Sequence, residues 1–420
     1  MTGKERWELA LAAGRETLER RQNQQCKVFS LKIDESHLNL MQKDYLKRIF
    51  LEAKWYTNKL LSFPSLWEGD ILDFKKKSKK EVEVKTVDGT ETRPLLYFKS
   101  QNQGAAYDAL IWAIKGLSSS KKKGRKVGKL KFKKSVDVIT YPQFRVSWDW
   151  KDDRIKLSGC KSFFKVEGLD QLPAEKEFSI AKLVRKPSGY YIQLTVFIPK
   201  VARVKTGKSV GLDFGIKDTI VTSDGEKFNV KVPPTKKLKH LQKIASRKQK
   251  GSKNRRKAND KTAQEYERVK NQKTDQVNKI VSKLKKENDV IYIQDELISL
   301  WQKGWFGKQV QNSALGAIKG KLKALPSTRV LSSRFPTTKL CYQCGRIHSE
   351  LTLGDRVFKC ECGLEEDRDI KAARTILIVG QMKFDSRPEQ TSTPVEGLTS
   401  IVEACFDDKS SSMKQEAPSL

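Results

Sequence analysis

Histidine is scarce in this chain of 420 residues, which contains only His37, His240 and His348. A site built on a histidine nucleophile or general base is therefore disfavoured, and carboxylates are the groups left for metal chemistry. The chain also has no apolar run of about 18 or more residues and no secretory signal pattern at its start. We therefore expect neither a membrane protein nor a secreted one.

Cysteine is limited as well. The chain has seven, an odd number, and four of them fall in one short window near the C-terminus. The other three, Cys26, Cys160 and Cys405, are scattered. This distribution fits a reducing compartment with one metal site better than a disulfide framework.

Negative charge is also in short supply. The chain carries 84 Lys and Arg against 50 Asp and Glu, a net charge of +34. Such a protein is expected to bind polyanions, because each neutralised phosphate releases condensed counterions. Its length predicts about two or three domains. Charge alone leaves a ribosomal or structural nucleic-acid binder open.

Periodicity gives a coarse layout. An alternating strand spans 26–34, and amphipathic helices follow at 46–60 and 106–117. Residues 126–200 read as several short strands between Gly, Asp and Pro turns, which is typical of a small β-barrel. The highly charged region 234–286 predicts two antiparallel helices joined by a loop near Gly251.

The most specific local pattern is a pair of cysteine knuckles. Cys341-Tyr-Gln-Cys344 is followed, after fifteen residues, by Cys360-Glu-Cys362. Four thiolates at this spacing are expected to hold a structural Zn²⁺ tetrahedrally. The second knuckle is one residue shorter than usual, and His348 is a candidate substitute ligand.

Carboxylates follow two predicted strands. Asp213 ends the apolar run Ser209-Val-Gly-Leu and precedes a hairpin turn, with Asp218 as the nearest competitor. Asp295 and Glu296 end the strand that begins at Val290. Neighbours in a strand point to opposite faces, so only one of these two can face a metal site.

A third acidic position comes just after the cysteine window. Asp369 opens a predicted helix, and the structural explanation for this residue is a plain helix cap. Asp367 is the other candidate. Three converging carboxylates and few histidines suit a site with two Mg²⁺ ions. Such a site activates water and stabilises the leaving oxygen of a phosphodiester.

These motifs, in this order, resemble the transposon-encoded TnpB family and its descendants, the miniature type V-F CRISPR effectors. The matching stretches are Gly211-Leu-Asp-Phe-Gly, Gln294-Asp-Glu296, the cysteine window and Asp367-Arg-Asp-Ile-Lys-Ala-Ala, within roughly residues 207–380. Two features depart from the family pattern: Lys371 stands where asparagine is usual, and the second knuckle is shortened.

The resemblance implies an RNA-guided DNA endonuclease that cleaves target double-stranded DNA beside a short flanking motif, with sequence read by a guide RNA. Its Mg²⁺-binding catalytic residues would be Asp213, Glu296 and Asp369. Glu296 is preferred over Asp295 because the family shows glutamate followed two residues later by an apolar residue. The implied location is the prokaryotic cytoplasm, at the nucleoid, and a homodimer on the RNA is left open.

The resemblance also implies an α+β multidomain architecture. A wedge β-barrel would carry an inserted helical recognition domain, and a RuvC (ribonuclease-H-like) α/β domain would carry the inserted zinc ribbon. The expected boundaries are an N-terminal extension at 1–25, the wedge at 26–35 and 126–205, the recognition domain at 36–125, the RuvC-like domain at 206–337 and 367–382, the ribbon at 338–366 and a disordered tail at 383–420.

Three rival functions remain at this point. A type V-F CRISPR effector would use the same chemistry. A nucleic-acid-binding protein would use the basic regions without cleavage. A ribonuclease-H-like transposase would act on transposon ends without a guide.

Overall fold

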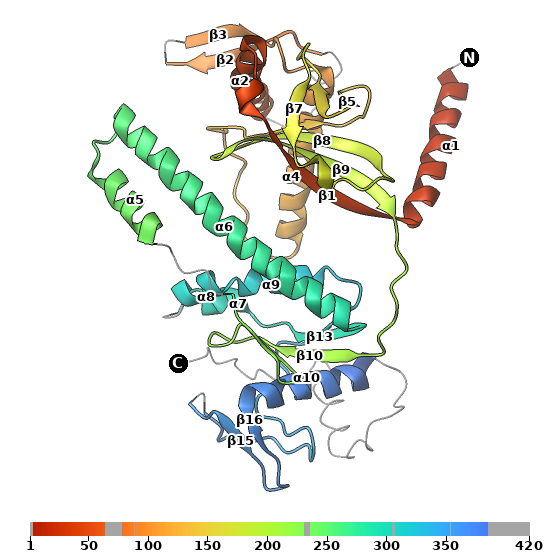
Figure 1. Ribbon diagram of the computed structural model, residues 1–420, viewed down its shortest axis with the longest axis vertical. Coiled ribbons are helices and arrows are strands. Elements are labelled where there is room, and N and C mark those ends of the chain that lie inside the picture. The colour runs from red at the N-terminus through yellow and green to blue at the C-terminus, as the bar shows by residue number, and fades with distance from the viewer. Residues whose placement is uncertain are drawn as a thin grey trace. The chain divides into compact units, whose positions relative to one another are not determined.

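The computed structural model describes residues 3–63, 78–87, 89–230, 236–304, 307–352 and 354–384. The predicted disordered tail lies outside these ranges except for its first two residues. The chain divides into two compact units, Met1–Ala202 and Arg203–Leu420, which are described separately (Figure 1). Over the described residues, no helix is long and apolar enough to cross a membrane.

The first unit is built on a seven-stranded antiparallel sheet in the order β4-β8-β9-β1-β7-β6-β5. It is nearly closed, in agreement with the predicted small barrel. The long pairing of β1 with β9 joins the start of the unit to its end, from Gln24 opposite Pro199 to Lys32 opposite Tyr191. The strands are β1 (Gln24–Ile33), β4 (Val138–Tyr141), β5 (Trp148–Lys151), β6 (Arg154–Leu157), β7 (Phe164–Glu167), β8 (Glu177–Lys186) and β9 (Gly189–Pro199).

Helices and a hairpin are inserted between β1 and β4. Helix α2 (Leu40–Leu61) starts with a capping box formed by Asn39 and Gln42, and its apolar face is buried in the core of the sheet, as its periodicity predicts. The other elements of the unit are α1 (Gly3–Gln22), η1 (Glu35–His37), β2 (Glu81–Thr86), β3 (Gly89–Pro94), α4 (Ser100–Lys122) and η2 (Leu169–Gln171).

The second unit contains a five-stranded mixed sheet in the order β12-β11-β10-β13-β14. Strand β10 pairs antiparallel with β11, as the predicted hairpin requires, and parallel with β13. Strand β14 is parallel to β13. The strands are β10 (Ser209–Asp213), β11 (Ile220–Thr222), β12 (Lys227–Phe228), β13 (Val290–Gln294) and β14 (Thr328–Leu331).

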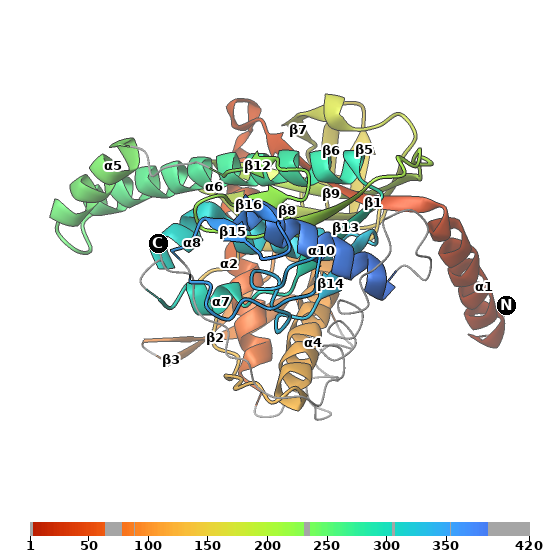
Figure 2. The ribbon, with the colours of Figure 1, turned by 90° about the horizontal axis from the view of Figure 1, so that it is seen from below.

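Helices cover both faces of this sheet (Figures 1 and 2). Ile291 and Ile293 share a core with α6 (Lys253–Glu287) and α9 (Leu315–Lys323), whereas Tyr292 packs with α10 (Arg368–Phe384) on the opposite face. The remaining elements are α5 (Lys236–Arg247), α7 (Ile298–Trp301), α8 (Gly307–Ser313), β15 (Val357–Lys359) and β16 (Glu365–Asp367).

Two glycines allow α10 to lie directly against the strands. A Cβ atom on Gly211 of β10 would lie 2.1 Å from the Ala373 carbonyl oxygen, and one on Gly380 would lie 2.2 Å from Cδ1 of Tyr292. A side chain at Gly211 would have to displace the backbone of α10, and one at Gly380 would have to displace the Tyr292 ring. The sequence Gly-Leu-Asp thus places Asp213 where α10 is closest to the sheet.

We expect Gly211→Ala to lower the stability of the protein by roughly 1–3 kcal/mol, the usual cost of overpacking a core. Gly320→Ala is the matched control, because a Cβ there meets nothing within 4 Å. That substitution should stabilise α9 by up to about 1 kcal/mol. Urea unfolding of both variants measures the difference, and equal stabilities would contradict the close approach of α10.

Candidate active site and cysteine ribbon

The first two candidate carboxylates lie at one edge of the mixed sheet. Asp213 is the last residue of β10, and Glu296 follows β13 by two residues. Because β10 and β13 are parallel and in register from Ser209 opposite Val290, their carboxyl ends meet at the same edge.

Asp369 approaches this edge from α10. It lies in the first turn of that helix, which packs against β10 through Gly211. Burial, and next the negative charge of Asp369, raise the pKa of Asp213 to about 8, while Arg368 and Lys371 oppose the rise. The structure therefore brings Asp213 and Asp369 into one electrostatic environment.

Glu296 belongs to the same environment. Burial, and next the charge of Asp213, raise its pKa well above the usual range. Its Oε2 atom is buried and has no hydrogen-bond partner among the described residues. A buried acceptor oxygen beside the Asp213 carboxylate is a costly arrangement without a cation, and it fits a site that binds Mg²⁺.

Asp295 has a different environment. Its Oδ1 lies 2.7 Å from Nζ of Lys319 and 2.7 Å from Nζ of Lys323, both on α9. Burial by itself would raise the pKa of Asp295, but the two lysines lower it below its ordinary value. Lys319 also donates a hydrogen bond to the Glu296 carbonyl oxygen. Asp295 thus faces α9, and this pair of lysines fixes the strand end that carries Glu296.

The other two competitors also have structural partners. Asp367 accepts hydrogen bonds from the Asp369 amide at 2.9 Å and the next amide of α10, as a helix-capping residue does, and it pairs with Lys227 at 3.2 Å. Asp218 accepts a hydrogen bond of 2.7 Å from the Asn229 side chain. These contacts favour Asp213 and Asp369 as the metal-facing groups, and the assignment remains a prediction.

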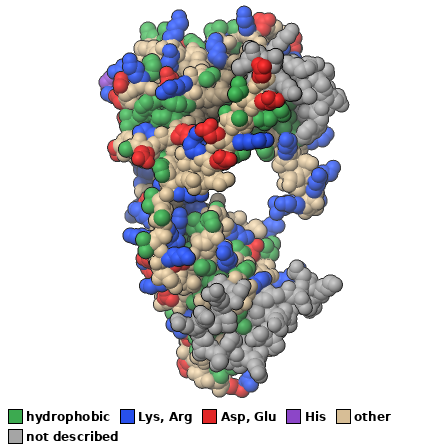
Figure 3. All heavy atoms as spheres, turned by 90° about the vertical axis from the view of Figure 1, so that its right-hand side faces the viewer, with side chains coloured by type: hydrophobic (Ala, Val, Ile, Leu, Met, Phe, Trp, Pro, Cys, Tyr) green, Lys and Arg blue, Asp and Glu red, His purple; other side chains and the backbone are tan. Residues whose placement is uncertain are grey.

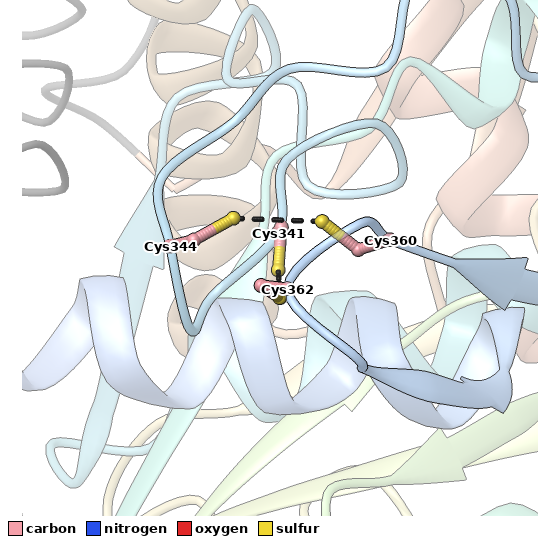
Figure 4. Close-up of side chains that lie close together, drawn as sticks. All are labelled: Cys341, Cys344, Cys360 and Cys362. Atoms are coloured by element: carbon pink, nitrogen blue, oxygen red, sulfur yellow. Dashed lines mark hydrogen bonds between the residues drawn. The ribbon is translucent and has the colours of Figure 1, made fainter.

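The four cysteines of the predicted ribbon come together. Their sulfur atoms all lie within 4.8 Å of one another, and the side chains point toward a common centre (Figure 4). Cys341 Sγ is 3.7 Å from Cys362 Sγ, and Cys344 Sγ is 3.5 Å from Cys360 Sγ. Zn–S bonds of about 2.3 Å in a tetrahedron place sulfurs about 3.8 Å apart, so this cluster fits zinc in spite of its shortened second knuckle.

His348 lies beside the cluster rather than within it. Its Nε2 is 3.3 Å from Cys360 Sγ, and its Nδ1 is 2.9 Å from a Glu350 carboxylate oxygen. A histidine in this position contacts a ligand sulfur and helps to orient it, which is a supporting role. The four-cysteine set therefore needs no substitute ligand.

Basic side chains are widely exposed. Figure 3 shows Lys and Arg spread over the drawn face. The basic segment 121–129, which begins in the last turn of α4 and continues into a loop, is solvent-exposed. Such surfaces provide the sequence-independent part of nucleic-acid binding.

Two family models match the chain in consecutive segments. The OrfB_IS605 model, described as a probable transposase, matches residues 191–297. The Cas12f1-like TNB domain model matches residues 318–376. The first segment contains Asp213 and Glu296, and the second contains the four cysteines and Asp369.

Two individual proteins are similar over longer stretches. A protein of Streptomyces pristinaespiralis named "Putative RNA-guided DNA endonuclease" is 28% identical over 246 residues, which are 56% of this chain and 61% of that protein. The chain thus spans about three fifths of the length of this curated relative. A cryo-EM structure of a Cas12f1–sgRNA–target DNA complex covers 84% of this chain and 99% of its own at 13% identity, with a TM-score of 0.47.

The second unit thus combines a mixed sheet that ends in carboxylates with a four-cysteine ribbon, in the two segments that match the probable-transposase and Cas12f1-like TNB models. The resemblance to the TnpB and miniature type V-F proteins seen in the sequence is confirmed.

Replacing two of the four cysteines tests the ribbon. We expect the double substitution Cys341→Ser Cys344→Ser to reduce bound zinc from about one ion per chain to near none, because two thiolates cannot close the site. Elemental analysis of the purified protein measures this. Cys26→Ser, an exposed cysteine outside the ribbon, is the control. Full zinc content in the double variant would contradict the assignment.

Asp213→Asn tests the buried charge through pH. The pKa of Asp213 is about 8 in the folded protein against an ordinary value of 3.8, so the stability that this group contributes is present below pH 3.8 and is lost as the pH rises toward 8. The neutral variant should therefore gain stability over the wild type progressively between about pH 4 and 8 in Mg²⁺-free buffer. Added Mg²⁺ should raise the melting temperature of the wild type more than that of the variant.

The control for this experiment is Asp260→Asn on the exposed side of α6. Thermal unfolding of the three proteins across the pH series gives the comparison. A pH-independent difference between Asp213→Asn and the wild type would show that Asp213 is not a buried, like-charged carboxyl.

Proposed function

We propose that this protein is a Mg²⁺-dependent, RNA-guided DNA endonuclease that cleaves double-stranded target DNA beside a short flanking motif. The observation that carries the proposal is that burial and a neighbouring carboxylate raise the pKa both of Asp213, beside Asp369, and of Glu296, beside Asp213. The name of the Streptomyces pristinaespiralis relative supports guided DNA cleavage as the activity.

The three carboxylates would hold two Mg²⁺ ions, which activate water and stabilise the leaving oxygen of the scissile phosphodiester. The chain's own contribution is to place the ligands. Asp367 caps α10 and orients its first turn, and Lys319 fixes the β13 end through Asp295. The mixed sheet with helices on both faces supports a RuvC-like domain.

The remaining partners follow from charge and from the ribbon. Four thiolates would hold one structural Zn²⁺, and the basic surface would contact the phosphates of guide RNA and DNA. Base pairing with the guide would select the target. We place the protein in the prokaryotic cytoplasm at the nucleoid. The mass of the purified RNA complex distinguishes one chain from a homodimer on the RNA.

Sequencing the RNA that co-purifies with the protein, expressed with its native flanking DNA, tests guide use. We expect one discrete structured RNA with a variable end. Its origin in the 3′ end of the gene or in a repeat array separates a transposon protein from a CRISPR effector. Random host RNA would instead favour the binding protein, and strand joining without RNA would favour the unguided transposase.

Guided cleavage by single variants tests the site. We expect Glu296→Ala to lower the cleavage rate by more than about a hundredfold and Asp295→Ala by about tenfold or less, because Asp295 acts only through its lysine contacts. Asp213→Ala should abolish cleavage. All three variants should keep the co-purifying RNA. A larger loss with Asp295→Ala would show that the other strand face carries the site.

A further inference from the structure

Lys371 is a fully buried lysine on α10, two residues beyond Asp369. Its ammonium group donates hydrogen bonds to three backbone carbonyls in the segment that enters the cysteine ribbon. These carbonyls belong to Thr337 at 3.1 Å, Thr338, and Leu340 at 2.9 Å. Its Nζ also lies 4.0 Å from the centre of the Phe358 ring, inside the ribbon. The side chain therefore joins α10 to the ribbon and to the residue that precedes Cys341.

The same entry segment is held from the other side by β13. The Thr337 hydroxyl donates to Oε1 of Gln294 at 2.8 Å, and the Gln294 amide donates to the carbonyls of Phe335 at 2.6 Å and Ser332 at 3.1 Å. Gln294 is buried and lies two residues before Glu296. The Thr337 side chain thus contacts Gln294 of β13, which leads to Glu296, and the Thr337 carbonyl contacts Lys371 of α10, which carries Asp369.

These contacts connect three parts of the unit: the end of β13 that precedes Glu296, the first turn of α10 with Asp369, and the ribbon cysteines. Most of these hydrogen bonds are buried, and a buried carbonyl that loses its partner carries a desolvation cost. The connection is therefore expected to be rigid.

We propose that Lys371 is a positioning residue that couples the integrity of the cysteine ribbon to the placement of the carboxylates. It does so by holding the entry segment 337–340 against α10, while Gln294 holds that segment against β13. The expected effect on cleavage rests on the proposed function. The structural coupling between the ribbon and α10 rests only on the hydrogen bonds described above. Loss of zinc is transmitted to the first turn of α10 through Lys371.

The test compares three variants of the full chain. Lys371→Met keeps the unbranched shape and removes the donors, and Lys371→Arg keeps the charge and the donors. Lys383→Met changes an exposed lysine on the same helix and is the control. The measurements are the half-time of zinc release to a chromogenic chelator, hydrogen exchange of amides 368–372 and the Mg²⁺ concentration for half-maximal guided cleavage.

We expect Lys371→Met to release zinc about tenfold faster and to need about tenfold more Mg²⁺, a typical effect of removing a residue that supports metal ligands. Lys371→Arg should recover part of both losses, and Lys383→Met should match the wild type. A variant that loses melting temperature but keeps its Mg²⁺ requirement would show that Lys371 only stabilises the fold.

Zinc removal provides the second measurement. Chelation should speed exchange of amides 368–372 in the wild type and add little in Lys371→Met, because the connection is already broken there. Equal additional changes in both proteins, or no change in the wild type, would overturn the coupling. If the wild type never cleaves DNA with its co-purified RNA, the proposed function fails, whereas zinc release and exchange still decide the coupling.

Discussion

The packing of α10 directly against β10 and β13 is the contact on which the second unit depends. It is possible only because residues 211 and 380 are glycines, since a Cβ at either position would lie about 2 Å from backbone or ring atoms. This close approach brings the first turn of α10, with Asp369, to the strand edge that ends in Asp213. A helix displaced outward by one side chain would separate these carboxylates. The geometry of the candidate site is thus set by the packing of small residues.

The clustered carboxylates of the candidate site lower the stability of the folded protein. Asp213 and Glu296 are half-buried and close together, and Asp369 lies near Asp213. Burial and these neighbouring charges disfavour the ionised forms of Asp213 and Glu296. Two cations offset part of this cost: Arg368 and Lys371 oppose the rise in the pKa of Asp213, and Arg368 Nε lies 3.5 Å from Asp369 Oδ1. Lys319 is directed instead to Asp295 and a backbone carbonyl. The Oε2 atom of Glu296 is buried without a hydrogen-bond partner among the described residues, which is typical of a functional site rather than of a folding contact.

Local signals predicted much of this unit. Short apolar runs predicted the strands that end at Asp213 and near Glu296, and cysteine spacing predicted the ribbon, because both signals depend on residues close in sequence. The choice between Asp295 and Glu296 depends instead on Lys319 and Lys323, about 25 residues away, and no local pattern marks them as partners of that strand end. The roles of Gln294 and Lys371 were likewise missed, since both act on the carbonyls of a loop whose course depends on tertiary packing.

The ribbon is inserted between β14 and α10, and this position explains why its state matters for the carboxylates. Cys362 precedes Asp369 by seven residues, with β16 and the Asp367 cap in between. When the metal site is closed, only a few residues connect Cys362 to Asp369. Such a short connection strongly limits the positions that its two ends can take. On the other side, the segment before Cys341 is fixed by Lys371 and Gln294. With both ends of the insertion constrained, the orientation of the first α10 turn is determined from two directions. Opening the ribbon removes one of these two constraints. The cysteines therefore contribute to holding Asp369 in place.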